Sequence, residues 1–320
     1  KETFQSYIKF EEDLNLNQNF IVAVSGGPDS LALCFLSKIY SIKKNLNVKF
    51  LHVDHKLRKN SSKEAKFIKI LLKKFTDNFE TLTWNGKKPK SNIQSIARDK
   101  RYELLTKKAK KLKISNILLG HHSDDLIENF FIRILRGSGL NGLVSFDKET
   151  SRQNINLIRP LLKFSKFDLE NITKKVFENY VEDPSNINDK FRRVKIRNFI
   201  MNLESEGLNK DKFKLTIKNL KFASETIKYF VNKNLKQNAT ILDNNKHVIL
   251  NIDFFYQPEE VVFRSFTRVI KIVGKKYYPT RGKKVDNLIE KIKNDHSFKT
   301  TLGNCIIKRV NKTIIVSKEH

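Results

Sequence analysis

SGGPDS, at Ser25–Ser30, is the stretch that decides the fold, and it follows directly on the apolar run FIVAV at Phe20–Val24. That run is short and rich in β-branched residues, which is typical of a buried parallel strand. The ten residues after the hexapeptide, LALCFLSKIY, are apolar nearly all round and predict a buried helix. The hexapeptide is therefore predicted to form a tight turn from a strand into a helix.

Such a turn is suited to binding a phosphate group. Its two glycines allow positive φ angles and a close approach of the backbone to a ligand, and amide groups at the start of a helix point at an anion. Ser25 and Ser30 add hydroxyl donors, whereas Asp29 would repel phosphate unless it holds Mg²⁺ or caps the helix. The alternative is an ordinary turn with Asp29 as its cap.

Segments typical of strands and helices alternate four times in the first part of the chain. Strands are predicted at 20–24, 48–54, 79–84 and 116–119, and helices at 31–40, 63–75, 91–112 and 123–136. This alternation predicts an α/β fold with a doubly wound parallel sheet. Ligands bind such sheets beyond the carboxyl ends of the strands, where SGGPDS, HVDH (52–55) and GHHSDD (120–125) are all expected.

A smaller mixed α+β domain is predicted after the pattern changes beyond residue 198. A basic helix at 208–235 precedes short strands from 241, which include HVILNIDFF, and helices at 258–273 and 285–292. A terminal hairpin is predicted to pair 305–310 with 313–316 across Asn311-Lys312. We divide the chain into a catalytic domain at 1–215 and a substrate-binding domain at 216–320.

The charge of the chain favours a polyanionic partner. Lys and Arg number 63 against 34 Asp and Glu, a net charge of +29, and so strong a positive field attracts nucleic acid. In KKYYPTRGKK (275–284), Tyr277 and Tyr278 interleave with basic residues, which suits phosphate contact and base stacking. The alternatives are compositional drift, since the chain is also rich in Asn and Ile, and a basic loop with packed tyrosines.

A membrane protein and a disulfide are both unexpected. No apolar run approaches the roughly 18 residues that cross a bilayer, and Lys1–Phe10 lacks the apolar core of a signal peptide. Because the chain begins with Lys and not Met, we expect it to be trimmed or partial. Its two cysteines, Cys34 and Cys305, form no CxxC pair, which argues against a zinc knuckle and favours a cytoplasmic protein.

The segment after Gly120 carries the candidate catalytic groups. At 100° per residue, His121, Asp125 and Glu128 fall within about 60° of one another. The opposite side of that helix is apolar: Leu126, Ile127, Phe130 and Ile134. Carboxylates beside a phosphate loop can hold Mg²⁺ or bind an ammonium group and take its proton. The alternative is a solvated acidic stripe, and the sequence does not say which group would be the general base.

Two pairs of arginines are spaced to share a helix face. Arg98 and Arg101 are three residues apart, and Arg193 and Arg197 are four apart. Guanidinium groups match phosphate oxygens, so each pair could stabilise charge on a phosphate or hold an RNA backbone. The alternative is a solvated basic face.

The hexapeptide matches SGGxDS, and the chain therefore resembles the PP-loop ATP pyrophosphatases. Five further segments together resemble one group of them, the tRNA(Ile)-lysidine synthetases, over roughly residues 20–200. They are LHVDHKLR (51–58), QSIARDKRY (94–102), GHHSDDLIENFFIRILRGSG (120–139), RPLL (159–162) and DPSNINDKFRRVKIRN (183–198). The C-terminal stretch from Thr300 resembles the small substrate domain of that group, with Asn304 where a second glycine is expected.

This resemblance implies an ATP-dependent ligase that joins lysine to C2 of a wobble cytidine. ATP is cut between its α and β phosphates, AMP passes to the cytidine oxygen, and the amine of lysine displaces AMP. The implied partners are ATP, Mg²⁺, free L-lysine and tRNA(Ile) with a CAU anticodon. The oligomeric state stays open, a homodimer included.

The site residues expected from the motifs and the resemblance form two groups. The ATP-binding group consists of Ser25, Gly26, Gly27, Pro28, Asp29, Ser30, Asp54 and Arg98. The catalytic group consists of Asp29, which would also bind Mg²⁺, His121, Asp125, Glu128, Arg193 and Arg197. The resemblance places Asp54 beside the adenosine of ATP, whereas the neighbouring His52 could equally be a packed strand residue.

Three other functions fit parts of the pattern. A tRNA-thiolating PP-loop enzyme generally needs paired cysteines or a cluster, and a small-molecule PP-loop synthetase would not need the basic second domain. A non-catalytic RNA-binding protein on a degenerate nucleotide fold would not be expected to keep SGGPDS together with His121, Asp125 and Glu128. We therefore expect the ligase.

Overall fold

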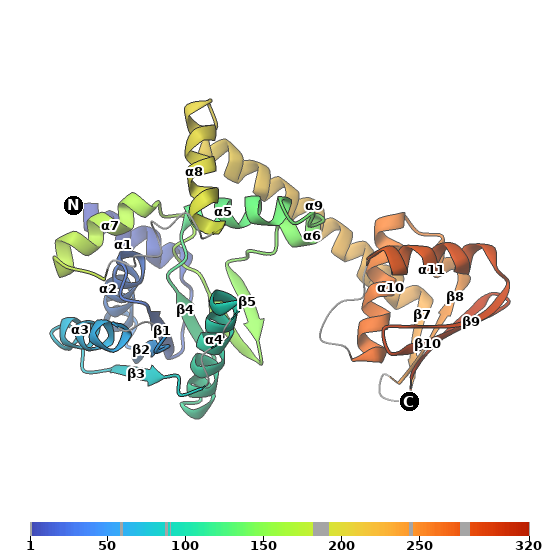
Figure 1. The fold of residues 1–320 in the computed structure, drawn as a ribbon, viewed down its shortest axis with the longest axis horizontal. Helices are drawn as coiled ribbons and strands as arrows, with labels where there is room; N and C mark the ends of the chain where they lie inside the picture. Colours follow the sequence, from blue (N-terminus) through green and yellow to red (C-terminus); the bar gives the residue numbers. More distant parts are fainter. Residues whose placement is uncertain are drawn as a thin grey trace. The chain divides into compact units, whose positions relative to one another are not determined.

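The structure, a computed structural model, describes residues 2–57, 60–86, 89, 91–181, 192–242, 246–275 and 282–319. Segment 183–191, Tyr277 and Tyr278, which the sequence singles out, lie outside the described residues. The chain forms two compact units, Lys1–Lys214 and Leu215–His320 (Figure 1). Within the described ranges, no helix is both long enough and apolar enough to cross a membrane.

The first unit is built on a six-stranded sheet. Its strands are β1 (Phe20–Val24), β2 (Val48–Asp54), β3 (Phe79–Thr83), β4 (Asn116–Leu119), β5 (Glu149–Arg152) and β6 (Ile155–Ile158). They lie in the order β3-β2-β1-β4-β6-β5, and every pair is parallel except β5 with β6. The predicted parallel α/β sheet is confirmed. The β5–β6 hairpin was not predicted, because ETSR is polar and turns through Gln153 and Asn154, which both have positive φ.

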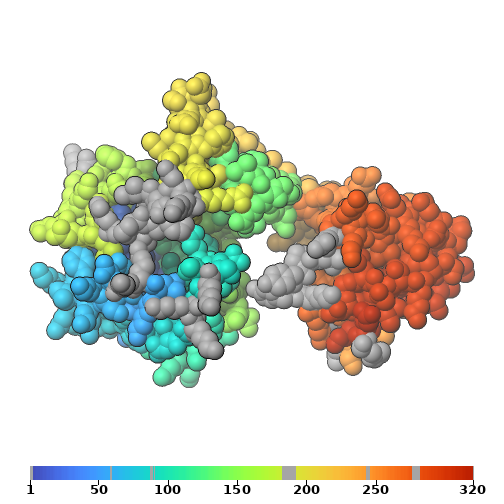
Figure 2. Space-filling model, viewed as in Figure 1, coloured from blue at the N-terminus to red at the C-terminus, as the bar shows by residue number. Residues whose placement is uncertain are grey.

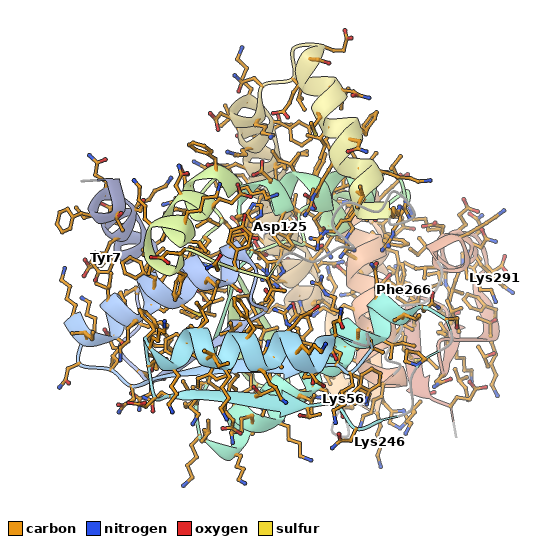
Figure 3. All side chains as sticks on the ribbon, turned by 60° about the vertical axis from the view of Figure 1, so that its left-hand side comes forward. Tyr7, Lys56, Asp125, Lys246, Phe266 and Lys291 are labelled. Atoms are coloured by element: carbon orange, nitrogen blue, oxygen red, sulfur yellow. The ribbon has the colours of Figure 1, made fainter. Side chains whose placement is uncertain are left out.

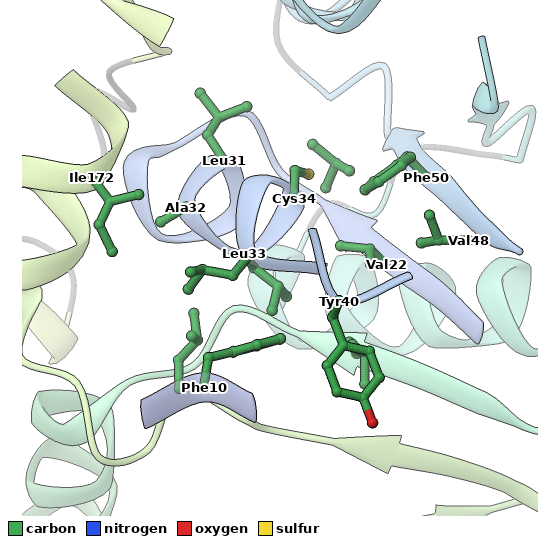
Figure 4. Close-up of a cluster of buried hydrophobic side chains, with 14 of the residues drawn as sticks. Phe10, Val22, Leu31, Ala32, Leu33, Cys34, Tyr40, Val48, Phe50 and Ile172 are labelled. Carbon is green, nitrogen blue, oxygen red and sulfur yellow. The ribbon is translucent and has the colours of Figure 1, made fainter. Parts of the chain in front are cut away.

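Helices cover both faces of this sheet. On one face α1 (Glu2–Asp13), α2 (Pro28–Lys43), α3 (Ser61–Lys73) and α7 (Lys166–Phe177) pack on Val22, Val48 and Phe50. Figure 4 shows the buried side chains of α2 between these strand residues and those of Phe10 and Ile172. On the other face α4 (Ile93–Lys111) packs its Leu105 and Ala109 against Leu51 and Ile117. Burial on both faces explains why the strands are continuous apolar runs.

Two buried tyrosines in this core differ in their hydrogen bonding. The hydroxyl of Tyr40 accepts from the backbone N–H of Leu16 and donates to its carbonyl oxygen, both at 3.0 Å. The hydroxyl of Tyr7 is also buried, but no described residue is its hydrogen-bond partner. Only Tyr40 therefore uses its hydroxyl to fix the chain that leads into β1.

We expect Tyr40→Phe to lower the free energy of unfolding by about 1–2 kcal/mol, because it leaves the backbone groups of Leu16 without a partner. Tyr7→Phe is the matched control. It should change the free energy of unfolding by less than about 0.5 kcal/mol, because the hydroxyl that it removes forms no hydrogen bond with a described residue. Urea unfolding of both variants measures the difference. Equal losses would mean that ring packing, and not the hydroxyl, decides the cost.

Two further helices stand at the carboxyl edge of the sheet. They are α5 (Ser123–Ile134), which is followed by the short α6 (Leu140–Leu143), and α8 (Arg192–Ser205). Ile127 of α5 packs with Ile196 and Ile200 of α8 in a small separate core. In the space-filling view, α8 (yellow) projects from the surface of the first unit (Figure 2).

The second unit contains a five-stranded antiparallel sheet in the order β7-β8-β11-β10-β9. Its elements after α9 (Lys210–Asn238) are β7 (Ala239–Leu242), β8 (His247–Asn251), η3 (Ile252–Phe255), α10 (Glu259–Gly274), α11 (Gly282–Asn294), β9 (Ser297–Leu302), β10 (Cys305–Val310) and β11 (Thr313–Lys318). Helices α10 and α11 pack on the sheet through residues such as Phe266 and Ile292. The predicted hairpin is present and pairs Val310 with Thr313.

The structure shows how two segments of this unit, HVILNIDFF and the turn at Asn304, compare with the sequence predictions. HVILNIDFF was predicted as strand, but only its first half is one, because the Asn251 side chain accepts from the N–H of Phe254 and starts a 3-10 turn. Asn304, which stands where a second glycine was expected, has a φ of 63°. Asn tolerates this left-handed conformation better than most residues, so the departure is compatible with the turn.

Candidate active site

The SGGPDS turn lies between β1 and α2, as predicted, and its two glycines differ. Gly26 has a φ of 92°, and a Cβ there would come within 2.5 Å of the Ile68 side chain. Gly27 precedes α2 in an extended conformation, and a Cβ there would meet no atom closer than 3.9 Å. The carbonyl of Gly26 also accepts a hydrogen bond from the N–H of Val181, which follows α7. Only Gly26 is therefore required by both conformation and space.

The Ser30 hydroxyl organises this loop from within. It accepts from the backbone N–H of Ser25 at 3.1 Å and of Gly26 at 3.0 Å, and from the Ser25 hydroxyl at 3.0 Å. It donates to the carbonyl of Gly27 at 2.9 Å. The two serine hydroxyls, expected as direct phosphate donors, are thus bonded to the loop itself. The backbone N–H groups of the first turn of α2 are the donors that remain for an anion.

Gly120, at the end of β4, allows a close approach to that first turn. A Cβ at this position would lie 3.2 Å from both the N and the Cα of Ser30. Such contacts are tighter than most side chains accept, so a larger residue would push against the start of α2. The absence of a side chain brings the GHHSDD segment directly against the phosphate loop.

Two adjoining cavities, each of about 500 Å³, share Ala23, Ser25, Glu64 and Arg101. We call the first the β2 cavity; among its lining residues are His52, Asp54, Leu57, Ile93, Gln94 and Ala97. We call the second the loop cavity; it is lined by Asp29, Gly120, His121, Asp125, Arg193 and Arg197 among others. Together they form a path from the end of β2 across the phosphate loop to α5 and α8.

His122 caps α5 and links two candidate carboxylates. Its ring Nδ1 accepts from the backbone N–H of Asp124 at 3.3 Å, and the backbone N–H of His122 donates to the Asp125 carboxylate at 3.1 Å. Its Nε2 lies 3.7 Å from Asp29 and 3.6 Å from Asp125. Burial alone would lower the pKa of His122, but the carboxylates of Asp124, Asp125 and Asp29 raise it above its ordinary value. The phosphate loop and the start of α5 are thus joined electrostatically.

Both carboxylates predicted on α5 are paired with the arginines predicted on α8. Arg193 lies 3.0 Å from Asp125 and 3.1 Å from Glu128, and Arg197 lies 2.5 Å from Glu128. Burial would raise the pKa of Asp125, but His122 and Arg193 hold it below its ordinary value. The four groups therefore form one charged cluster, in which Asp125 stays ionised at neutral pH (Figure 3 labels Asp125).

His121 interacts electrostatically with Asp125, but its ring does not belong to the cluster of ion pairs. The helical projection placed His121 on the face of these carboxylates, but α5 begins only at Ser123, after His122 has served as the cap. Its ring instead packs edge-on against Phe146 at 5.4 Å, and burial lowers its pKa to about 3. His121 still lines the loop cavity, as a neutral imidazole.

On α4 the cavities are lined by Arg101 and not by the predicted Arg98. The Arg98 guanidinium lies over the ring of Tyr102, 5.5 Å from its centroid. Three residues further along, Arg101 lines both cavities. Two residues that are three positions apart share a helix face, but the side chains of Arg98 and Arg101 lie at opposite edges of that face and can point in different directions.

Asp54 and His52 lie where the sequence predicted, at the end of β2 in the β2 cavity. Asp54 accepts from the N–H of Lys56 at 2.9 Å and from the Ser62 hydroxyl at 3.3 Å. Burial alone would raise the pKa of Asp54, but these hydrogen bonds lower it below its ordinary value. His52 bonds the Val24 carbonyl through Nδ1 at 2.9 Å, which gives it a structural role in the strand pair.

The surroundings of Asp29 fit a bound Mg²⁺. Its Oδ1 is buried, and no described residue forms a hydrogen bond with it. No cluster of three or more His, Cys, Asp or Glu side chains suited to a metal occurs in the described ranges. Mg²⁺ is usually held by one or two carboxylates together with substrate phosphates and water, so one carboxylate beside a phosphate loop is an adequate donor set.

We expect Asp29→Asn to stabilise the unliganded protein at neutral pH. Burial raises the pKa of Asp29 from 3.8 to about 6, so between these values the unfolded chain releases a proton that the folded chain keeps. The ionised group therefore destabilises the fold increasingly as pH rises from about 4, and fully above about 6. Thermal unfolding without divalent cations should show a gain in Tm near pH 8 and little near pH 4; the same gain at both would contradict this.

Several lining residues were not among the predicted site residues. His122 was not predicted as a site residue, because His is an unusual helix cap. The spacing from His122 to Asp125 is nevertheless that of a capping box. Arg101 had been noted as a partner of Arg98, and only the structure separates them. Lys166 is the first residue of α7 and Val181 lies four residues after its last one, and α7 has no motif that the sequence analysis used.

The chain was compared with known proteins. Residues 1–204 match the family model of the PP-loop domain. A tRNA(Ile)-lysidine synthase of Wolbachia pipientis wMel is 31% identical over 95% of this chain and 71% of its own length. The tRNA(Ile)-lysidine synthase of Orientia tsutsugamushi is 31% identical over 97% of this chain and 71% of its own length. That of Rickettsia prowazekii is 30% identical over 98% of this chain and 74% of its own length. Among solved structures, the U34-tRNA thiolase NcsA from Methanococcus maripaludis has a TM-score of 0.60 at 15% identity, over 70% of this chain and 79% of its own; it shows the fold alone.

Proposed function

We infer that this chain, which belongs to the tRNA(Ile)-lysidine synthase family of PP-loop proteins, is an ATP-dependent ligase that modifies tRNA(Ile). We propose in particular that it joins free L-lysine to C2 of the wobble cytidine of a CAU anticodon. The observation that supports this best is the loop cavity, where the phosphate loop lies beside Asp125, Arg193 and Arg197. A phosphate cradle and an anionic group that can bind an ammonium are both needed for this reaction.

The fold alone does not favour the thiolase reaction. The thiolase matched above carries a [4Fe-4S] cluster according to its description. This chain has two cysteines, Cys34 in α2 and Cys305 in β10, and both are buried in separate units. They cannot supply the several thiolates of such a cluster.

We propose that the first half-reaction takes place where the two cavities meet. The adenosine of ATP occupies the β2 cavity near Asp54, and its phosphates lie on the N–H groups at the start of α2. The cytidine oxygen attacks the α-phosphate and pyrophosphate leaves. Arg101, which lines both cavities, is placed to stabilise the charge that develops on the α-phosphate.

In the second half-reaction, the lysine amine attacks C2 of the adenylated cytidine and AMP leaves. We propose that Asp125 and Glu128 bind an ammonium group of lysine. Their pairing with Arg193 and Arg197 holds them in position before lysine arrives, and the nearby positive charges keep Asp125 ionised. The arginine that yields to lysine then remains beside the site, where it can neutralise the phosphate of departing AMP.

Mg²⁺ at Asp29 would neutralise charge on the phosphates of bound ATP. We assign ATP and lysine chemistry to residues 1–215, and RNA contacts beyond the anticodon to residues 216–320. Because tRNA, ATP and free lysine occur together in the cytoplasm, we place the enzyme there. The oligomeric state is not part of this proposal.

The decisive experiment is incorporation of radiolabelled lysine into a tRNA(Ile) transcript with a CAU anticodon, with and without ATP. We expect label only with ATP, and none in tRNA(Met), which has the same anticodon. Absence of label, with pyrophosphate still released from ATP on another substrate, would keep the family and overturn the substrate. Label without ATP would overturn the adenylation step.

A further inference from the structure

Helix α9 exposes a regular row of large apolar side chains. Leu215, Phe222 and Tyr229 are 55%, 53% and 66% exposed. They are seven residues apart, so they drift by only about 20° per step and follow one another at about 10.5 Å along the helix. We call this row the α9 stripe. Exposed aromatic rings in a regular row are unusual on a surface that has no partner.

Lysines flank the α9 stripe. Lys218, Lys233 and Lys236 fall within about 60° of it on the helical projection, and Lys218 Nζ lies 5.6 Å from the centroid of the Phe222 ring. Between residues 215 and 238 the chain has five lysines and one glutamate. Over the ranges that the structure describes, no ion pair engages these three lysines. The surface is therefore both aromatic and positively charged.

The C-terminal part of the helix that carries the stripe is hydrogen-bonded to the rest of the second unit. On the opposite side of α9, the buried Asn234 side chain donates to the Phe254 carbonyl at 3.1 Å and to the Ser265 hydroxyl at 3.3 Å. Tyr229 itself lies edge-on against Phe230, with ring centroids 5.5 Å apart. The exposed ring of Tyr229 thus lies close to the anchored end of the helix, which reduces the entropy lost on binding there.

A second copy of the chain is a poor occupant for this surface. A coiled coil needs a second apolar position three or four residues after each member of the row. Those positions are Lys218, Asn219, Glu225, Thr226, Asn232 and Lys233, all polar. Two such helices side by side would also bring their lysines together, which is unfavourable.

RNA is a suitable ligand both for the aromatic rings and for the positive charge of this surface. Flat rings stack on bases of any sequence, and lysines between them neutralise phosphates. We propose that the α9 stripe binds unpaired nucleotides of the RNA substrate, as a contact separate from the residues that line the two cavities. That the RNA is tRNA(Ile) rests on the proposed function; the RNA-binding chemistry of the stripe does not.

The test is the full chain with Phe222→Ala and Tyr229→Ala combined, measured by filter binding to the tRNA(Ile) transcript. We expect at least about tenfold weaker binding, from the loss of stacking, and an unchanged kcat at saturating tRNA. Tyr256→Ala is the matched control, because Tyr256 is 68% exposed in the same unit but lies outside α9. Tyr229→Phe keeps the ring and should bind like the wild type.

Salt dependence gives a second measure. Lys233→Ala should lower the slope of log affinity against log salt by about 0.7, as expected for one lost phosphate contact with single-stranded RNA. Unchanged affinity in the double variant would overturn the inference, and so would a loss of self-association in sedimentation with RNA binding intact. If the wild type binds tRNA through the stripe but incorporates no lysine, the proposed function fails and this inference stands.

Discussion

Asp125→Asn should lower the rate of lysidine formation by about a thousandfold while tRNA affinity stays within a few-fold. Asp125 is buried in the loop cavity, 3.0 Å from Arg193 and 3.6 Å from His122. An amide of the same shape can still accept the backbone N–H of His122, so the cap of α5 is largely kept. What it loses is the negative charge that would bind an ammonium group. Single-turnover incorporation of labelled lysine measures the effect.

A matched variant separates charge from capping in this experiment. Asp168 plays the same capping part in α7, where it accepts from the N–H of Ser165 at 3.0 Å, but it does not line the loop cavity. Asp168→Asn should therefore lose a similar amount of stability and keep wild-type kcat. Normal turnover of Asp125→Asn would remove Asp125 from the site. Equal loss of activity in both variants would attribute the effect to helix capping.

The pairing of Asp125 with Arg193 illustrates what sequence could and could not supply. Both residues were candidates from their motifs, but they are 68 positions apart, and no local periodicity links two helices that meet only in the folded chain. The position of His121 was predicted from a helical projection that assumed the helix had already begun. The predicted helix also began at residue 123, so His121 lies two residues before it, where the rotation of 100° per residue does not apply; its ring packs on Phe146.

Elements of the fold could be predicted from the sequence where burial requires a continuous run of apolar residues. Strands such as Phe20–Val24 are buried on both faces and must be apolar throughout, so they were found. The edge strand Glu149–Arg152 is half exposed and polar, and its pairing with β6 depends on a turn that has no recognisable sequence motif. Helix α7 was not predicted either, although its Ser165 and Asp168 form a capping box and its Leu169, Ile172 and Phe177 are buried in the core.

Gly26→Ala should nearly abolish ATP-dependent turnover and lower the free energy of unfolding by about 2–5 kcal/mol. Part of the loss comes from placing a side chain at a φ of 92°, which costs about 1–2 kcal/mol. The rest comes from overpacking, about 1–3 kcal/mol, because the new Cβ would lie 2.5 Å from Ile68. A loop that shifts to relieve this contact moves the N–H groups that face the phosphates. Urea unfolding and ATP-dependent lysine incorporation measure the two effects.

Gly27→Ala provides the control, because its backbone is extended and its Cβ would have at least 3.9 Å of space. Its free energy of unfolding should stay within about 0.5 kcal/mol of the wild type. In Gly26→Ala, a second change of Ile68→Val removes the Cδ1 atom that the new Cβ would approach. It should restore part of the stability, whereas the strain of the positive φ and the contacts with Ile68 Cγ1 at 2.8 Å and Val181 at 3.2 Å remain. If Ile68→Val restored nothing, the contact with the Ile68 Cδ1 atom would play no part in the requirement for glycine, which would then rest on backbone strain and on the contacts with Ile68 Cγ1 and Val181.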